Sequence, residues 1–205
     1  MKERPILFND QMVRAILEGR KTATRRIAKP VKHPDLGNIY APGALMLERE
    51  PQHVIDRACP YGQPGDRLWV REAWQGPLIS DEEQAANQSW WKDMTKFQNP
   101  GHCAYRASGD DNEYVDPDGY FHCKWKPSIH MPRWASRILL EITAVRVERL
   151  HDLSDPGALA EGVSHSEMHS GDSLVDVFAR LWESTGGDWA ANPWVWVVEF
   201  KRVTP

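Results

Sequence analysis

Residues 19–26 read Gly-Arg-Lys-Thr-Ala-Thr-Arg-Arg, a basic stretch that stands between a predicted helix and a predicted strand. The helix begins after Asn9 or Asp10, since either residue caps a helix N-terminus, and Gly19 supplies the left-handed residue that ends it. Its apolar positions recur at helical spacing: Met12, Val13, Ile16 and Leu17. The basic stretch therefore leaves the C-terminal end of an amphipathic helix, with Lys21 at the hinge.

The strand that follows is predicted from Thr22 to Ile27. Successive side chains of a strand point to opposite faces. One face therefore carries Thr22, Thr24 and Arg26, and the other carries Ala23, Arg25 and Ile27. A phosphate-binding P-loop is rejected, because the second glycine is missing and the helix precedes the strand.

The rest of the chain predicts further strands separated by turns rich in Pro and Gly. Strands are expected at residues 5–8, 67–74, 137–149 and 194–200, and helices at residues 153–161 and 173–185. The alternation of apolar residues shifts parity near Ala144, which predicts a β-bulge of the kind that bends barrel strands. The expected fold is α+β, a small, partly open β-barrel with flanking helices.

Composition indicates one folded domain over residues 1–205, with an acidic loop insertion at residues 76–119. Hydrophobic residues make up 41% of the chain, which is ample material for a packed core. Residues 1–33 carry nine basic and three acidic side chains, whereas residues 76–119 carry nine acidic and three basic ones. The net charge of −4 argues against a groove for a long nucleic acid. A basic patch in residues 1–33 that binds a small anionic or polar ligand fits this charge distribution better.

Three cysteines, Cys59, Cys103 and Cys123, are too few for a disulfide framework and indicate a reducing, cytoplasmic setting. No apolar run approaches the length of a membrane span, so we expect neither membrane insertion nor secretion. The pairs His102-Cys103 and His122-Cys123 suggest zinc, but no Cys-x-x-Cys spacing supports it. We therefore expect no metal and no cofactor.

Three segments taken together resemble the ASCH domain family, which has a PUA-like fold. They are the string at residues 19–26, the run Pro-Gly-Asp-Arg-Leu-Trp-Val-Arg-Glu at residues 64–72, and the terminal strand Trp-Val-Val-Glu-Phe at residues 196–200. Residues 125–137 look like the longer phage and prophage-type members. The resemblance covers residues 5–75 and 120–203 and leaves the acidic middle as an elaboration.

Small bacterial members of this family are similar in the Gly-Arg-Lys-Thr-x-Thr string, and they are amidohydrolases that deacetylate N4-acetylcytidine with a Lys, a Thr and a Glu. The resemblance places this catalytic set on Lys21, Thr24 and Glu161. It implies an amidohydrolase that removes the acyl group from an N4-acylated cytidine-type nucleoside or base. Substrate binding is assigned to Thr22, Arg26, Trp69, Arg71 and Glu72.

The residue types suit that chemistry. Thr24 offers a hydroxyl, Lys21 serves as the base if burial beside an arginine lowers its pKa, and Glu161 returns a proton to the leaving nitrogen. Arg26 anchors a carbonyl oxygen, and a Trp such as Trp69 or Trp74 stacks on a pyrimidine. Each residue also has a structural interpretation, because threonines favour strands, tryptophans fill cores and Glu161 precedes the helix-ending Gly162.

Three functions compete. If the protein is an amidohydrolase, we expect a small closed pocket that holds Lys21, Thr24 and Glu161 within hydrogen-bond reach. If the protein binds or cleaves single-stranded RNA, we expect an open basic cleft. RNA binding should then be lost when Arg25 or Arg71 is changed. If the protein is an assembly protein with a vestigial site, we expect a large exposed apolar patch. The sequence favours the first. One departure from the family is Arg25, which replaces an apolar residue and would turn the strand towards phosphate binding.

Overall fold

A computed structural model describes residues 1–86, 89–115, 118–122 and 124–204. The contacts divide the chain into two compact units. The first comprises Met1–Arg4, Ala15–Leu68 and Leu140–Val203, and the second is built from Pro5–Arg14 and Trp69–Leu139. Residues 76–119, the acidic segment, fall entirely within the second unit.

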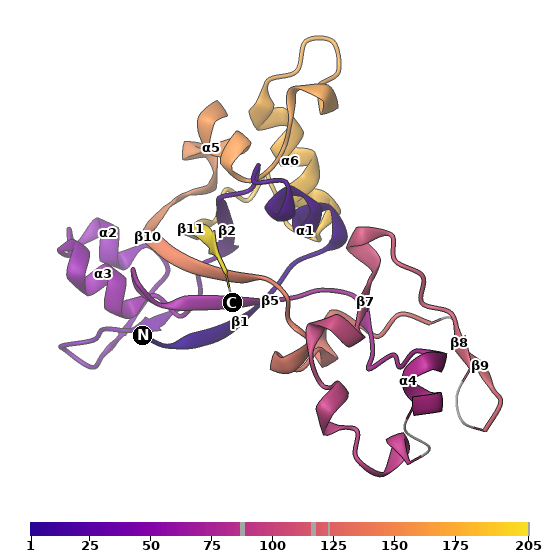
Figure 1. The fold of residues 1–205 in the computed structure, drawn as a ribbon. Helices are drawn as coiled ribbons and strands as arrows, with labels where there is room; N and C mark the ends of the chain where they lie inside the picture. The colour runs from indigo at the N-terminus through magenta and orange to yellow at the C-terminus, as the bar shows by residue number, and fades with distance from the viewer. Residues whose placement is uncertain (87–88, 116–117, 123, 205) are drawn as a thin grey trace. The chain divides into compact units, whose positions relative to one another are not determined.

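Short helices and strands make up both units (Figure 1). The α-helices are α1 (Asp10–Leu17), α2 (Ala44–Leu47), α3 (Gln52–Ala58), α4 (Asp81–Ala86), α5 (Asp155–Ala160) and α6 (Leu174–Ser184). The strands are β1 (Glu3–Leu7), β2 (Ala23–Ile27), β3 (Val31–Lys32), β4 (Ile39–Tyr40), β5 (Arg67–Arg71), β6 (Trp74–Gln75), β7 (Ala104–Tyr105), β8 (Tyr114–Val115), β9 (Phe121–His122), β10 (Leu139–Arg149) and β11 (Trp194–Val203). Single 3₁₀ turns lie at Trp90–Lys92, Thr95–Phe97, Pro100–His102, Arg106–Ser108, Ser128–His130, Arg133–Ala135, Leu150–Asp152 and His165–Glu167.

The main sheet has five strands in the order β1-β5-β10-β11-β2. β11 lies inside the sheet, as its apolar sequence predicts, and pairs antiparallel with β2 so that Val198 is opposite Thr24. In the part of the chain that the structure describes, no pairing of β1 with β2 closes a barrel. The open five-stranded sheet with flanking helices confirms the expected α+β class.

Local sequence signals account for most of these elements. Asn9 caps α1, because its side-chain oxygen accepts the Met12 backbone N–H at 2.9 Å. Ser173 caps α6 together with Asp176, in a reciprocal capping box. The buried side chains of β10 change from Leu140 and Ile142 to Val145 and Val147, the parity shift that the sequence predicts.

The strand expected at residues 67–74 is instead broken. β5 ends at Arg71, and β6 begins only at Trp74. The backbone N–H of Glu72 donates to the Met131 sulfur at 3.3 Å, and its buried carboxylate accepts two hydrogen bonds from Arg137 at 3.0 and 2.9 Å. The strand is therefore interrupted where the chain buries a charged side chain in a long-range pair, and alternation alone does not reveal such a pair.

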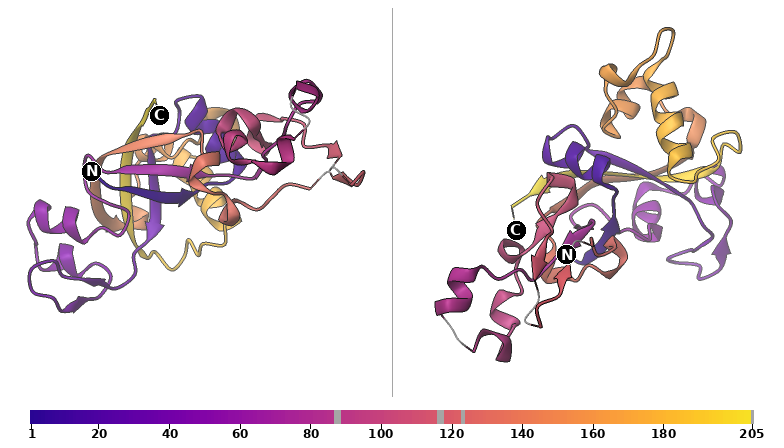
Figure 2. Two further views of the ribbon diagram at one scale, coloured as in Figure 1. Left: turned by 60° about the horizontal axis from the view of Figure 1, so that its bottom comes forward. Right: turned by 90° about the vertical axis from the view of Figure 1, so that its right-hand side faces the viewer.

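In the first unit, α5 and α6 lie together over β2 and β11, while α2 and α3 form a separate group beyond the strands (Figures 1 and 2). The apolar core beneath the two later helices includes Leu153, Ala158, Phe178, Val195 and Val197. This packing fixes α5 against the start of β2. None of the described helices has the length and apolar composition to cross a bilayer.

The second unit has its own smaller core, formed by Trp74, Tyr105, Met131 and Ala135. Tyr105 belongs to the acidic segment expected to be a loop insertion, yet it is 3% exposed and donates its hydroxyl to the Ala135 carbonyl at 2.8 Å. Part of residues 76–119 is therefore a packed element of this unit.

Candidate active site

The basic string at residues 19–26 is anchored at its hinge by two backbone hydrogen bonds. The Lys21 N–H donates to the Ala15 carbonyl of α1 at 3.0 Å, and the Thr22 N–H donates to the Ala160 carbonyl of α5 at 2.8 Å. Gly19, with φ +77°, makes the turn that leaves α1. The end of α5, where Glu161 lies, therefore sits against the start of β2.

Lys21 and Glu161 form a buried ion pair at this junction. The Lys21 Nζ donates to Glu161 Oε2 at 2.5 Å and to the Glu161 backbone carbonyl at 2.9 Å. The Lys21 side chain is 0% exposed and that of Glu161 is 2% exposed. Burial lowers the pKa of the Lys21 amine; Glu161 opposes this shift, and the guanidiniums of Arg26 and Arg25 add to it.

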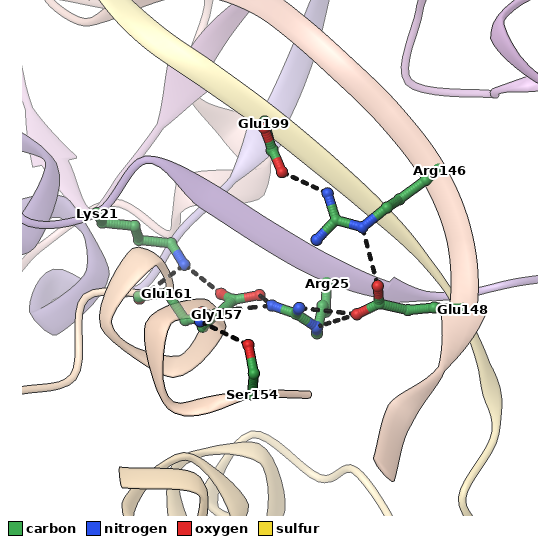
Figure 3. A network of polar contacts seen from close by, with 8 residues as sticks. All are labelled: Lys21, Arg25, Arg146, Glu148, Ser154, Gly157, Glu161 and Glu199. Atoms are coloured by element: carbon green, nitrogen blue, oxygen red, sulfur yellow. Dashed lines mark hydrogen bonds and ion pairs between the residues drawn. The ribbon is translucent and has the colours of Figure 1, made fainter. Parts of the chain in front are cut away.

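Arg25 holds the other side of the Glu161 carboxylate. Its Nη1 donates to Glu161 Oε1 at 3.3 Å, and its Nε and Nη2 donate to Glu148 Oε1 at 3.0 and 2.7 Å. Figure 3 shows that these contacts continue through Arg146 to Glu199. Cations and carboxylates thus alternate from the buried amine of Lys21 to the surface. We call this series the ion chain: Lys21, Glu161, Arg25, Glu148, Arg146 and Glu199.

A pocket of about 260 Å³ lies along the outer part of the ion chain. It is lined by Ala23 and Arg25 of β2, Arg146 and Glu148 of β10, and Ser154 before α5, among others. Ala23 and Arg25 therefore share a face of β2, as predicted. Lys21 and Glu161 do not line this pocket. It is therefore not the closed pocket around Lys21, Thr24 and Glu161 that an amidohydrolase is expected to have.

Gly162 lets α5 approach Lys21 closely. It has φ +93°, and a Cβ at this position would lie 2.8 Å from the Ala15 Cβ and 3.0 Å from the Lys21 Cβ. Gly162→Ala is therefore expected to lower the free energy of unfolding by about 1–3 kcal/mol, measured by urea denaturation. Gly171→Ala is the matched control, because Gly171 has φ +92° but nothing within 4 Å of the new Cβ. Equal losses in the two variants would contradict the role of close packing.

Thr24 is buried on β2, 2% exposed. Thr22 is exposed just before the strand, and Arg26 is partly buried on it. Burial lowers the pKa of the Arg26 guanidinium, whereas Tyr61 and Glu161 raise it. The site thus brings together two residues of the predicted catalytic set, with Arg26 within electrostatic range of Glu161.

Sequence reasoning missed Tyr61, Glu148 and Arg146. Tyr61 lies in a Pro- and Gly-rich stretch without periodicity, and burial raises the pKa of its phenol while the Arg26 charge lowers it. Arg25 also differs from expectation, because its guanidinium is engaged by two carboxylates and is not available for a phosphate. Ion pairs between segments more than 100 residues apart leave no local pattern.

The remaining predicted binding residues, Trp69, Arg71 and Glu72, belong to the second unit. The Arg71 guanidinium lies 4.8 Å from the centroid of the Trp69 ring, a cation–π contact. Glu72 is paired with Arg137, and burial raises the pKa of its carboxyl while Arg137 lowers it. Trp74, a candidate stacking residue, packs edge-on against Trp134 in the core of this unit.

Among the residues that the structure describes, no group of three or more His, Cys, Asp or Glu side chains is placed to hold a metal ion. Cys59 is buried, and burial raises the pKa of its thiol to about 11. His102 pairs with Glu83 at 2.9 Å. Cys123, part of the zinc hypothesis, lies outside the described residues.

Comparison with known proteins finds no matching family model and no matching curated protein. A solved structure that is similar is a high-resolution crystal structure of an ASCH domain from Lactobacillus crispatus. The two chains are 16% identical with a TM-score of 0.38, and the match covers 100% of this chain and 81% of that chain.

Proposed function

We propose that this protein is an ASCH-type amidohydrolase that removes the acyl group from an N4-acylated cytidine-type nucleoside or base. The observation that carries the proposal is the buried amine of Lys21, which lies 2.5 Å from the Glu161 carboxylate and three residues before Thr24 on the same stretch. A lysine whose pKa is lowered by burial is a competent general base, and a neighbouring carboxylate can carry its proton.

The reaction then runs through an ester on Thr24. The Thr24 oxygen attacks the acyl carbon as its proton passes to the neutral Lys21 amine. That proton crosses the Lys21–Glu161 contact and is given to the exocyclic nitrogen as the carbon–nitrogen bond breaks, which releases the free nucleoside. Water then hydrolyses the ester, so that a carboxylic acid leaves and Thr24 regains its proton. In the substrate complex the Thr24 hydroxyl donates to the Lys21 amine, because catalytic hydrogen bonds commonly tighten there.

Arg26 supports the choice of substrate class. It lies within electrostatic range of Glu161, and its donors suit the carbonyl oxygen of a pyrimidine or the developing oxyanion of the acyl group. Thr22, exposed beside Lys21, adds a hydroxyl for a polar substrate atom. No metal or other cofactor takes part in these steps.

The test is to incubate the protein with N4-acetylcytidine and to follow cytidine by chromatography. We expect conversion by the wild type and its loss in Lys21→Met and Glu161→Gln, with folding of each variant checked by circular dichroism at the assay temperature. Lys126→Met is the matched lysine control, because Lys126 contacts Trp74 and the Gly76 carbonyl in the second unit. Conversion that persists in Lys21→Met would remove Lys21 from the mechanism.

One observation favours a second candidate, binding of single-stranded RNA. The guanidinium of Arg71 over Trp69 is a cation–π arrangement of the kind that accompanies base stacking in single-strand recognition. Titration with labelled single-stranded RNA at two salt concentrations separates the candidates. Salt-sensitive binding that weakens in Arg71→Gln, without turnover of the nucleoside, would favour this function over hydrolysis.

A further inference from the structure

Arg25 lies between Glu161 and Glu148 in the ion chain. Its side chain is 2% exposed and forks between two carboxylates, Glu161 on one side and Glu148 on the other (Figure 3). The Nη1 atom also lies 3.5 Å from the Gly157 carbonyl of α5. A buried guanidinium with this many partners has a fixed position.

The two oxygens of the Glu161 carboxylate are held by two different cations. Oε2 accepts from Lys21 and Oε1 accepts from Arg25. The terminal torsion of a glutamate is broad, so a carboxylate held at one oxygen alone is free to rotate. With both oxygens held, the carboxylate plane is fixed relative to the Lys21 amine.

We propose that Arg25 is a positioning residue of this site: it fixes the Glu161 carboxylate against Lys21, and Glu148 in turn holds Arg25. The inference rests on the proposed function, since it assigns a proton-transfer role to the Lys21–Glu161 pair. It adds Arg25 and Glu148 to the residues that act on the Lys21–Glu161 pair.

The charges that face Lys21 are those of Glu161, Arg25 and Arg26. Removal of Arg25 takes away a cation that favours the neutral amine. It also frees the Glu161 charge to act on Lys21 alone. Both effects raise the pKa of Lys21, so at a given pH more of the amine is protonated and less can act as a base.

Three variants separate charge from geometry. Arg25→Met removes the charge and the fork. Arg25→Lys keeps the charge but cannot hold two carboxylates with a planar fork. Arg146→Met is the matched control, because Arg146 contacts Glu148 and Glu199 without touching Glu161. For each variant, the Lys21 titration is followed by NMR of ¹³Cε-labelled lysine, with Lys21→Met giving the assignment, and kcat and KM are measured on N4-acetylcytidine.

We expect the Lys21 titration to move to higher pH in Arg25→Met and to stay near its wild-type position in Arg25→Lys and Arg146→Met. In both Arg25 variants kcat falls by roughly 10- to 100-fold with KM little changed, the effect of a misplaced catalytic group. The proposal is overturned if Arg25→Met leaves the Lys21 titration unchanged or if Arg146→Met matches it. If the wild type shows no turnover, the proposed function fails, and the titration alone still decides whether Arg25 controls the Lys21–Glu161 pair.

Discussion

Glu161→Gln is expected to lower the free energy of unfolding by about 3–5 kcal/mol, the usual cost of leaving a buried charge without its partner. Glu161 is the carboxylate that contacts both Lys21 and Arg25, and all three side chains are at most 2% exposed. In the variant, the Lys21 amine loses the carboxylate of Glu161 and still faces the guanidiniums of Arg25 and Arg26. Urea denaturation at neutral pH measures the loss.

Lys21→Met provides the comparison for that prediction. It removes one cation but leaves Glu161 paired with Arg25, so the loss of stability should be smaller than in Glu161→Gln. A larger loss in Lys21→Met than in Glu161→Gln would contradict the ion chain as described. The order of the two variants, and not their absolute values, is the decisive result.

The pH dependence of the same pair has a definite sign. Because the pKa of Lys21 is lowered in the folded state, the unfolded chain binds more protons between that value and the ordinary value of 10.5. The contribution of Lys21 to stability therefore rises with pH across this window. Below the window the buried amine is charged and its contribution is smallest.

Thr24→Val is expected to reduce turnover of N4-acetylcytidine by roughly 10³-fold or more, because it removes the nucleophilic oxygen. Valine has nearly the same shape and suits a strand, so the buried position on β2 tolerates it. Thr24→Ser restores a hydroxyl and should retain much of the activity. The rates of cytidine release by the three proteins, compared by chromatography, give the result.

Thr143→Val is the control for that series, since Thr143 is an exposed threonine on β10 and undergoes the same chemical change. It should leave turnover unchanged. If Thr24→Val retained wild-type turnover, a water molecule and not Thr24 would be the nucleophile, and only the Lys21–Glu161 pair would remain of the proposed mechanism.

Local signals in the sequence predict much of the fold. The cap at Asn9, the turn at Gly19 and the capping box at Ser173 each depend on residues a few positions apart, so they can be recognised without tertiary information. The interior position of β11 follows from its apolar residues on both faces.

The features that the sequence could not predict depend on long-range charge pairs. Arg137 binds Glu72 at the break in the predicted strand. Glu148 and Glu161 bind Arg25 from β10 and the end of α5. Such pairs are set by tertiary packing and carry no periodicity. The string at residues 19–26 indicated a basic site, but only the structure shows that two of its cations share one carboxylate.

The most direct test of the account is the rate of cytidine release from N4-acetylcytidine by the wild-type protein, measured as a function of pH. The account predicts turnover that rises with pH through one ionisation below the ordinary 10.5 of a lysine, as the Lys21 amine loses its proton. Absence of cytidine release at every pH, from protein shown to be folded, would contradict it.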